Sequence, residues 1–193
     1  ADSATVDGNF FYINLPGTGN SYVGINIVGA AVKNTVVTGN TALIKKNADP
    51  KGNAFFLIAN GNKSASNEYG LSGLKVTDNT VSNETGIDPS DPKAYGVGVS
   101  NAESAVISGN TFEKLYAGVS PTGWPNEAAS KNLEVDGNTF SDCYYGVFMR
   151  TTDVESGAVV STNNDFGQTK YPYIGDALVW QSEDGHLYPD VNN

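Results

Sequence analysis

Cysteine is almost absent from this chain of 193 residues, and the single copy, Cys143, excludes an internal disulfide or a metal site built from several thiolates. Histidine also occurs once, as His186 in the C-terminal tail, so the chain has few side chains suited to general acid–base catalysis. No apolar run approaches the ~18 residues that a membrane-spanning helix needs. Insertion into a membrane is therefore not expected.

Positive charge is scarce as well. Eleven Lys and Arg residues stand against 21 Asp and Glu, the formal net charge is −10, and Arg150 is the single arginine. Since no run of basic residues is available to neutralise phosphates, nucleic-acid binding is not expected, and anionic membrane surfaces are disfavoured for the same reason. The Ala-Asp start fits either a mature product after signal cleavage or a trimmed chain. The expected location is secreted, extracellular or at the cell surface.

What the sequence does contain is a short pattern repeated six times. Each copy reads apolar, small polar, Gly or Asp, then Asn, with an apolar residue soon after. The copies are Thr5–Phe10, Val36–Thr41, Lys75–Thr80, Val106–Thr111, Glu134–Thr139 and a decayed Val159–Asn164. Their anchor asparagines are Asn9, Asn40, Asn79, Asn110, Asn138 and Asn164.

A second short element follows each anchor, and five of its six copies begin with Tyr, an optional residue and Gly. The copies are Tyr22–Ile27, Ala54–Ile58, Tyr95–Val99, Tyr116–Val119, Tyr145–Met149 and Tyr173–Leu178. Two unrelated patterns that recur in the same order favour a repeat architecture over a globule with chance turns.

Strands of three to five residues with period-2 alternation are too short to bury a core alone, so they must stack coil upon coil. Stacking lays like residues over like and predicts a ladder of inward-pointing asparagines. We expect each asparagine to adopt the left-handed conformation at its bend and to bond unpaired carbonyls there, with the preceding Gly serving the same corner. The predicted fold is all-β: one single-stranded right-handed parallel β-helix domain over 1–193, with about six coils over about 4–180 and a tail at 181–193.

Two copies make a family resemblance visible. Ala105–Phe112 (AVISGNTF) and Leu133–Phe140 (LEVDGNTF), each followed by Tyr-x-Gly-Val or Tyr-Gly-Val, resemble the repeats of the pectate-lyase-like superfamily. The resemblance covers residues 4 to 180 and implies the right-handed parallel β-helix. It implies no single function, because that superfamily includes lyases, glycosidases, epimerases, adhesins and surface proteins.

The first three coils carry extra residues between the anchor asparagine and the second element, so these insertions should project side by side from one edge of the solenoid. Their charges, together with a Trp on a later loop, are the predicted binding residues: Lys45, Asp49, Lys51, Asp88, Asp91, Lys93 and Trp124. The carboxylates Asp49, Asp88 and Asp91 are also the candidates for a calcium site; otherwise no cofactor is expected. The competing interpretation is that Asp-Pro and Asn-Gly pairs simply form turns, with charges added for solubility.

Catalytic candidates are few. Asp88 and Asp91 form the best carboxylate pair for glycoside hydrolysis, which needs two carboxyls at a set separation. Some epimerases of the resembled superfamily use an Asp-Pro-His segment, but this chain has Ser90 after Asp88-Pro89, so that role is not carried over. The superfamily's lyases pair acidic calcium clusters with an arginine, which makes Arg150 a candidate, although alternation points it outward. Cys143 has no nearby histidine and is expected to be an unreactive thiol.

The ends of the stack raise a further question. A repeat strand begins within the first few residues with no helical cap before it, whereas the C-terminal residues could fold over the last coil. The chain is either cut from a longer protein, docked on another subunit through its first coil, or closed by Ala1–Thr5. The predicted function is a non-catalytic extracellular surface or assembly subunit, forming a filament or layer by self-association through the solenoid ends, or an adhesin contacting a glycan. The alternative is a polysaccharide-active enzyme or enzyme fragment, a lyase, glycosidase or uronan epimerase.

Overall fold

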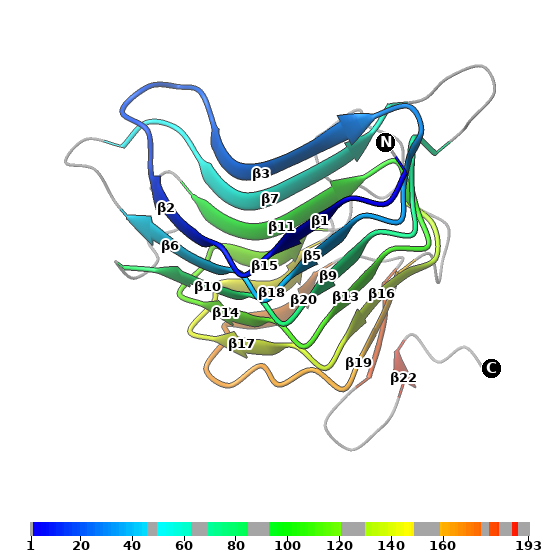
Figure 1. Ribbon diagram of the computed structural model, residues 1–193. Coiled ribbons are helices and arrows are strands. Elements are labelled where there is room, and N and C mark those ends of the chain that lie inside the picture. Colours follow the sequence, from blue (N-terminus) through cyan, green and yellow to red (C-terminus); the bar gives the residue numbers. More distant parts are fainter. Residues whose placement is uncertain are drawn as a thin grey trace.

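The computed structural model describes residues 2–45, 50–62, 69–84, 93–120, 130–148, 159–174, 178–181 and 187–188. Over these ranges the protein is all-β, and the strands form stacked layers in which nearly every pairing is parallel (Figure 1). Successive coils lie one above another, because each strand pairs with its counterpart from the coil before and the coil after. The predicted all-β parallel solenoid is thereby confirmed.

Four sheets line the stack. The first sheet contains β1 (Thr5–Asp7), β5 (Val36–Thr38), β9 (Lys75–Thr77), β13 (Val106–Ser108), β16 (Leu133–Asp136), β19 (Val159–Thr162), β21 (Leu178–Gln181) and β22 (Leu187–Tyr188). The second contains β2 (Phe10–Asn14), β6 (Thr41–Lys45), β10 (Thr80–Asn83), β14 (Thr111–Glu113) and β17 (Thr139–Ser141). The third contains β3 (Tyr22–Gly29), β7 (Ala54–Gly61), β11 (Ala94–Ser100), β15 (Ala117–Ser120), β18 (Tyr145–Phe148) and β20 (Tyr171–Ile174). The fourth is short: β4 (Val32–Lys33), β8 (Leu71–Ser72) and β12 (Ala102–Glu103).

The asparagine ladder lies at the corner between the first and second sheets. Asn40, Asn79, Asn110 and Asn138 are each about 1% exposed, and each backbone N–H donates to the side-chain oxygen of the next asparagine at 3.0 Å or, in the last case, 2.8 Å. The same bonds join Asn9 to Asn40 and Asn138 to Asn164. Each of the four buried side-chain amides also donates to a carbonyl of the preceding coil, as Asn79 does to Val37 at 3.0 Å. This ladder fixes the vertical register of the coils.

The backbone conformation of that corner differs from the prediction. The left-handed residue is the one before each ladder asparagine, with φ between +53° and +65°, and the ladder asparagines themselves are not left-handed. The left-handed residues are Gly8, Gly39, Asp78, Gly109, Gly137 and Asn163. The reason is that the turn is made one residue earlier, which leaves the asparagine free to point its amide into the stack. Gly, Asp and Asn are the residues that tolerate this conformation.

The core is built from matched large and small residues in adjacent sheets. The rings of Phe112, Phe140 and Phe166 stack at centroid distances of 5.3 and 4.9 Å. A Cβ added at Gly118 would collide with the Phe140 ring, and one at Gly146 would collide with the Phe166 ring. The glycine of the Tyr-Gly pattern therefore makes room for the phenylalanine stack.

Two details of the second pattern are corrected. The strands of the third sheet reach seven or eight residues in β3, β7 and β11, longer than the three to five expected, because the repeated pattern covers only part of each strand. In the last coil Tyr171, rather than Tyr173, lies opposite Tyr145, while Tyr173 lies opposite Val147. The true copy is thus Tyr171-Pro172-Tyr173, which has lost its glycine.

Candidate functional site

The described residues of the first three insertions include neighbours that are hydrogen-bonded to one another. The carbonyl of Pro16 in the first insertion accepts from the backbone N–H groups of Lys51 and Gly52 in the second, at 2.9 and 3.2 Å. The side-chain oxygen of Asn53 then accepts from the Lys93 N–H of the third at 2.9 Å. The described residues of these loops lie at one edge of the solenoid, next to the starts of β3, β7 and β11 (Figure 1).

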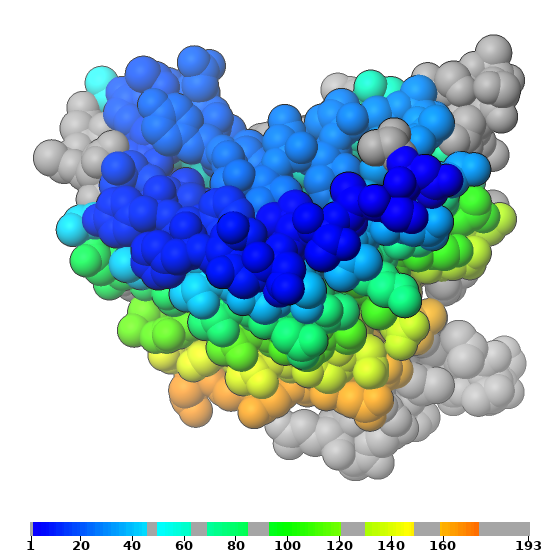
Figure 2. Space-filling view, in the orientation of Figure 1, coloured from blue at the N-terminus to red at the C-terminus, as the bar shows by residue number. Residues whose placement is uncertain are grey.

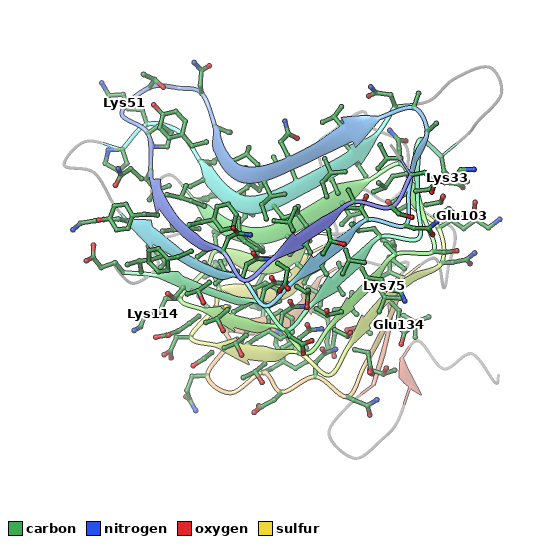
Figure 3. All side chains as sticks on the ribbon, viewed as in Figure 1. Lys33, Lys51, Lys75, Glu103, Lys114 and Glu134 are labelled. Atoms are coloured by element: carbon green, nitrogen blue, oxygen red, sulfur yellow. The ribbon has the colours of Figure 1, made fainter. Side chains whose placement is uncertain are left out.

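The lysines of this loop edge do not converge on one ligand position. Lys45 forms an ion pair with Glu84 at 3.4 Å, with both side chains about 43% exposed. A hydrogen bond that the Lys45 ammonium donates to the Tyr12 side chain, followed by the nearby Glu84 carboxylate, raises the pKa of Lys45. Lys93 instead places its ammonium 4.2 Å from the centre of the Tyr116 ring. The side chain of Lys51 is exposed on this edge (Figure 3).

Several predicted site residues lie outside the described residues: Asp49, Asp88, Asp91, Trp124 and Arg150. The single histidine, His186, lies outside them as well. The structure therefore does not test whether Asp88 and Asp91 form a carboxylate pair, whether Asp49 joins them in a calcium site, or where Arg150 points. Within the ranges that the structure describes, no three His, Cys, Asp or Glu side chains come together as a metal site. The same ranges contain no helix long and apolar enough to cross a membrane.

The first coil, blue in Figure 2, lies at one end of the stack, and its core residues are incompletely covered. Its inward residues Val6 and Ile27 are only partly buried, whereas their counterparts in the second coil, Val37 and Ala59, are fully buried. A hollow of about 590 Å³ opens between β2 and β3. It is lined by Phe11, Tyr12, Ile13, Asn14, Ser21, Tyr22, Val23, Gly24 and Asn26.

Exposed rings and aliphatic groups add to this end. Phe10 is 67% exposed, and Tyr12, Tyr22 and Val28 are about half exposed. Phe10 occupies the place that threonine holds in the next four coils, at Thr41, Thr80, Thr111 and Thr139. Sequence reasoning missed these residues, although an aromatic residue in a threonine column is a signal that the aligned repeat contains. An exposed apolar surface with open strand edges is a typical contact surface.

A second feature that the sequence analysis missed is a continuous group of rings on the outer face of the third sheet. We call it the aromatic strip: Phe55, Tyr95, Tyr116, Tyr144, Tyr145, Phe148 and Tyr171. The sequence pattern identifies tyrosine only as a signature of the repeat. Phe55 and Tyr95 are stacked at 4.5 Å and 5% exposed, while Tyr171 at the other end is 39% exposed.

Two lysines lie on the aromatic strip. Lys93 lies over Tyr116, and the ammonium of Lys170 lies 4.9 Å from the centre of the Tyr144 ring and 5.1 Å from that of Tyr171. Burial, followed by the neighbouring Tyr116 and Tyr144, raises the pKa of Tyr145 to about 12. The hydroxyl of Tyr145 therefore stays protonated at physiological pH, beside the two ammonium groups.

Cys143 is buried at 2% exposure and forms no disulfide. Burial raises the pKa of its thiol to about 11. Because the thiolate is the reactive species, this cysteine is suited to packing and not to nucleophilic chemistry.

The comparisons with known proteins add no relative. A scan against protein-family models found no match, and searches of the curated proteins and of the solved structures found none either. The fold, the open first coil and the aromatic strip are thus the features from which a function can be argued.

Proposed function

We propose that this protein is a non-catalytic extracellular structural protein: a surface or assembly subunit, within a filament or layer, that self-associates through its first coil. The proposal includes the finer fold, a right-handed single-stranded β-helix of about six coils in the pectate-lyase-like superfamily. The observation that supports it is the uncovered first coil, in which Val6, Phe11 and Ile27 remain partly exposed at positions that are fully buried one coil later.

The physical argument is the hydrophobic effect acting at a strand edge. Fully burying a Val, Ile or Phe side chain stabilises by about 1.5–3 kcal/mol, so covering several first-coil residues favours association. Open strand edges add unpaired N–H and C=O groups that another strand can satisfy. Among the described residues, β1, β2 and β3 have no strand on their outer side, because each ends its sheet.

The test is the solution mass of the chain across a micromolar concentration range, by light scattering, with negative-stain imaging in parallel. We expect assemblies larger than a monomer, and we expect Val28→Lys on β3 to shift the mass toward the monomer. Val160→Lys is the matched control, since Val160 is an exposed valine on β19, several strands away from β1 in the first sheet. A wild-type monomer at all concentrations would refute the proposal.

A second candidate function, glycan contact by an adhesin, is favoured by the aromatic strip. Tyrosine rings offer flat apolar faces for sugar rings, and Lys93 and Lys170 offer ammonium groups beside them. Affinity electrophoresis against neutral and acidic polysaccharides tests this directly. Tyr171→Ala should abolish retardation, and Tyr22→Ala, at an exposed tyrosine outside the strip, should not.

An enzymatic function as lyase, glycosidase or epimerase remains the alternative of a different class. It would depend on Asp88, Asp91 and Arg150, which lie outside the described residues, and no described group supports it. A calcium site at Asp49, Asp88 and Asp91 would likewise depend on residues that lie outside the described ranges. Repeating the mass measurement with added calcium and with a chelator tests whether the metal takes part in assembly.

A further inference from the structure

The two ends of the solenoid differ in strand direction. At the N-terminal end, β1, β2 and β3 run parallel to the strands beneath them and each ends its sheet. At the other end, the first sheet finishes with β22, a two-residue strand antiparallel to β21 through the pairs Trp180–Tyr188 and Gln181–Leu187. No other pairing between strands in the described ranges is antiparallel.

This difference decides which ends can meet. Head-to-tail stacking would need three parallel edges at the C-terminal end, but the outer edge of β21 is already paired with β22. A first coil facing another first coil meets no such obstacle, because antiparallel pairing is available to any two open edges. The open surface also contains the same uncovered apolar residues on both copies, as a self-complementary contact requires.

We infer that the first coil binds the first coil of a second copy across a two-fold axis, with β3 running antiparallel to the β3 of that copy. This inference rests on the proposed self-association and specifies its partner and geometry. With eight residues, β3 is the longest strand of the first coil. The contact is closed, since it uses the open end of both copies, and further growth into a layer or filament would need a second surface.

The charges of the first coil make this contact sensitive to salt. Residues 2–29 contain two carboxylates, Asp2 and Asp7, and no lysine or arginine. The backbone of Asp2 pairs with that of Lys33 in an isolated β-bridge, and the Asp2 carboxylate accepts from the Asn34 amide at 3.3 Å. Asp7 lies opposite the uncharged Thr38. Lys33 lies at the far side of the stack from the loop edge (Figure 3). Two copies therefore bring like charges together, and added salt should lower the dissociation constant of the dimer.

A cysteine scan along β3 tests the two-fold geometry. A two-fold axis through the sheet keeps outward residues outward, so an exposed residue near the strand centre comes opposite its own copy. Asn26 is such a residue, with Tyr22 and Val28 as exposed positions on either side. Each is changed singly to Cys, and Val160→Cys near the other end is the control. The native Cys143 does not interfere, because it is buried.

We expect light scattering to give a mass that stops at two chains, and mild oxidation to crosslink Asn26→Cys nearly completely but Tyr22→Cys, Val28→Cys and Val160→Cys little. A mass that keeps growing with concentration, without crosslinking of Asn26→Cys, overturns this inference and leaves the proposed self-association standing. A dimer without crosslinking at any β3 position overturns the β3 pairing. A monomer under all conditions overturns both proposals.

Discussion

Replacing Asn110 with alanine should destabilise the solenoid more than any comparable change at its end. The Asn110 amide donates to the carbonyls of Val76 at 2.8 Å and Ser108 at 3.1 Å and to the side chain of Asn138 at 2.9 Å. Its oxygen accepts from the backbone and side-chain amides of Asn79 at 3.0 and 2.9 Å. The residue is 1% exposed, so water cannot replace these partners.

The magnitude follows from the groups left unpaired. Asn110→Ala leaves the Asn79 N–H and the Val76 carbonyl without these hydrogen bonds inside the stack. Each buried polar group that loses its partner costs about 1–3 kcal/mol, which gives a total of roughly 2–6 kcal/mol. For a chain of this size, each kcal/mol lowers the melting temperature by about 2–4 °C.

Asn9→Ala is the matched control at the end of the same ladder. Its amide donates to the Asp7 carbonyl at 2.9 Å and to Asn40 at 3.1 Å, but the residue is exposed and water can take over much of this bonding. We expect a loss of no more than about 1 kcal/mol. Urea unfolding followed by circular dichroism, checked for reversibility, compares the variants. If Asn110→Ala loses no more stability than Asn9→Ala, the ladder is not what holds the coils in register.

Two further predictions concern packing and pH. Gly118→Ala should lower the free energy of unfolding by about 1–3 kcal/mol, because the new Cβ collides with the Phe140 ring. Gly98→Ala is the control and should be neutral or slightly stabilising, since the nearest atoms to its new Cβ lie at 3.9 Å. Equal urea midpoints for the two variants would contradict the size-matched core. The pKa of Cys143 is raised from 9.0 to about 11, so the folded state holds the proton more tightly, and the contribution is fully present below pH 9 and lost as the pH rises to 11. The loss should be roughly 3 kcal/mol and absent in Cys143→Ala, and equal pH slopes in the two proteins would disprove it.

The stacking of coils could be predicted because the repeat can be read directly from the amino-acid sequence. Six asparagines at corresponding positions imply a ladder whatever the loops do, and the hydrogen bonds from Asn9 to Asn164 follow that order. The contacts between the described ends of the insertions follow from the same alignment, since equal positions in successive coils must lie above one another. The register in the last coil could not be predicted, because Tyr173-Ile174-Gly175 fits the pattern whereas Tyr171-Pro172-Tyr173 has no glycine. Only the pairing with Tyr145 identifies Tyr171 as the counterpart.

The sequence by itself determined the element type and the order of stacking, since short repeated strands have no other way to bury their apolar residues and satisfy their backbone. Only the tertiary structure decided which residues meet across the coils. The aromatic strip joins residues from 55 to 171, and the left-handed turn falls one residue before the asparagine, because ring contacts and backbone angles depend on the packing of neighbouring coils. The antiparallel strand β22 distinguishes the two ends of the solenoid. It belongs to no repeat, so the periodicity of the sequence could not predict it.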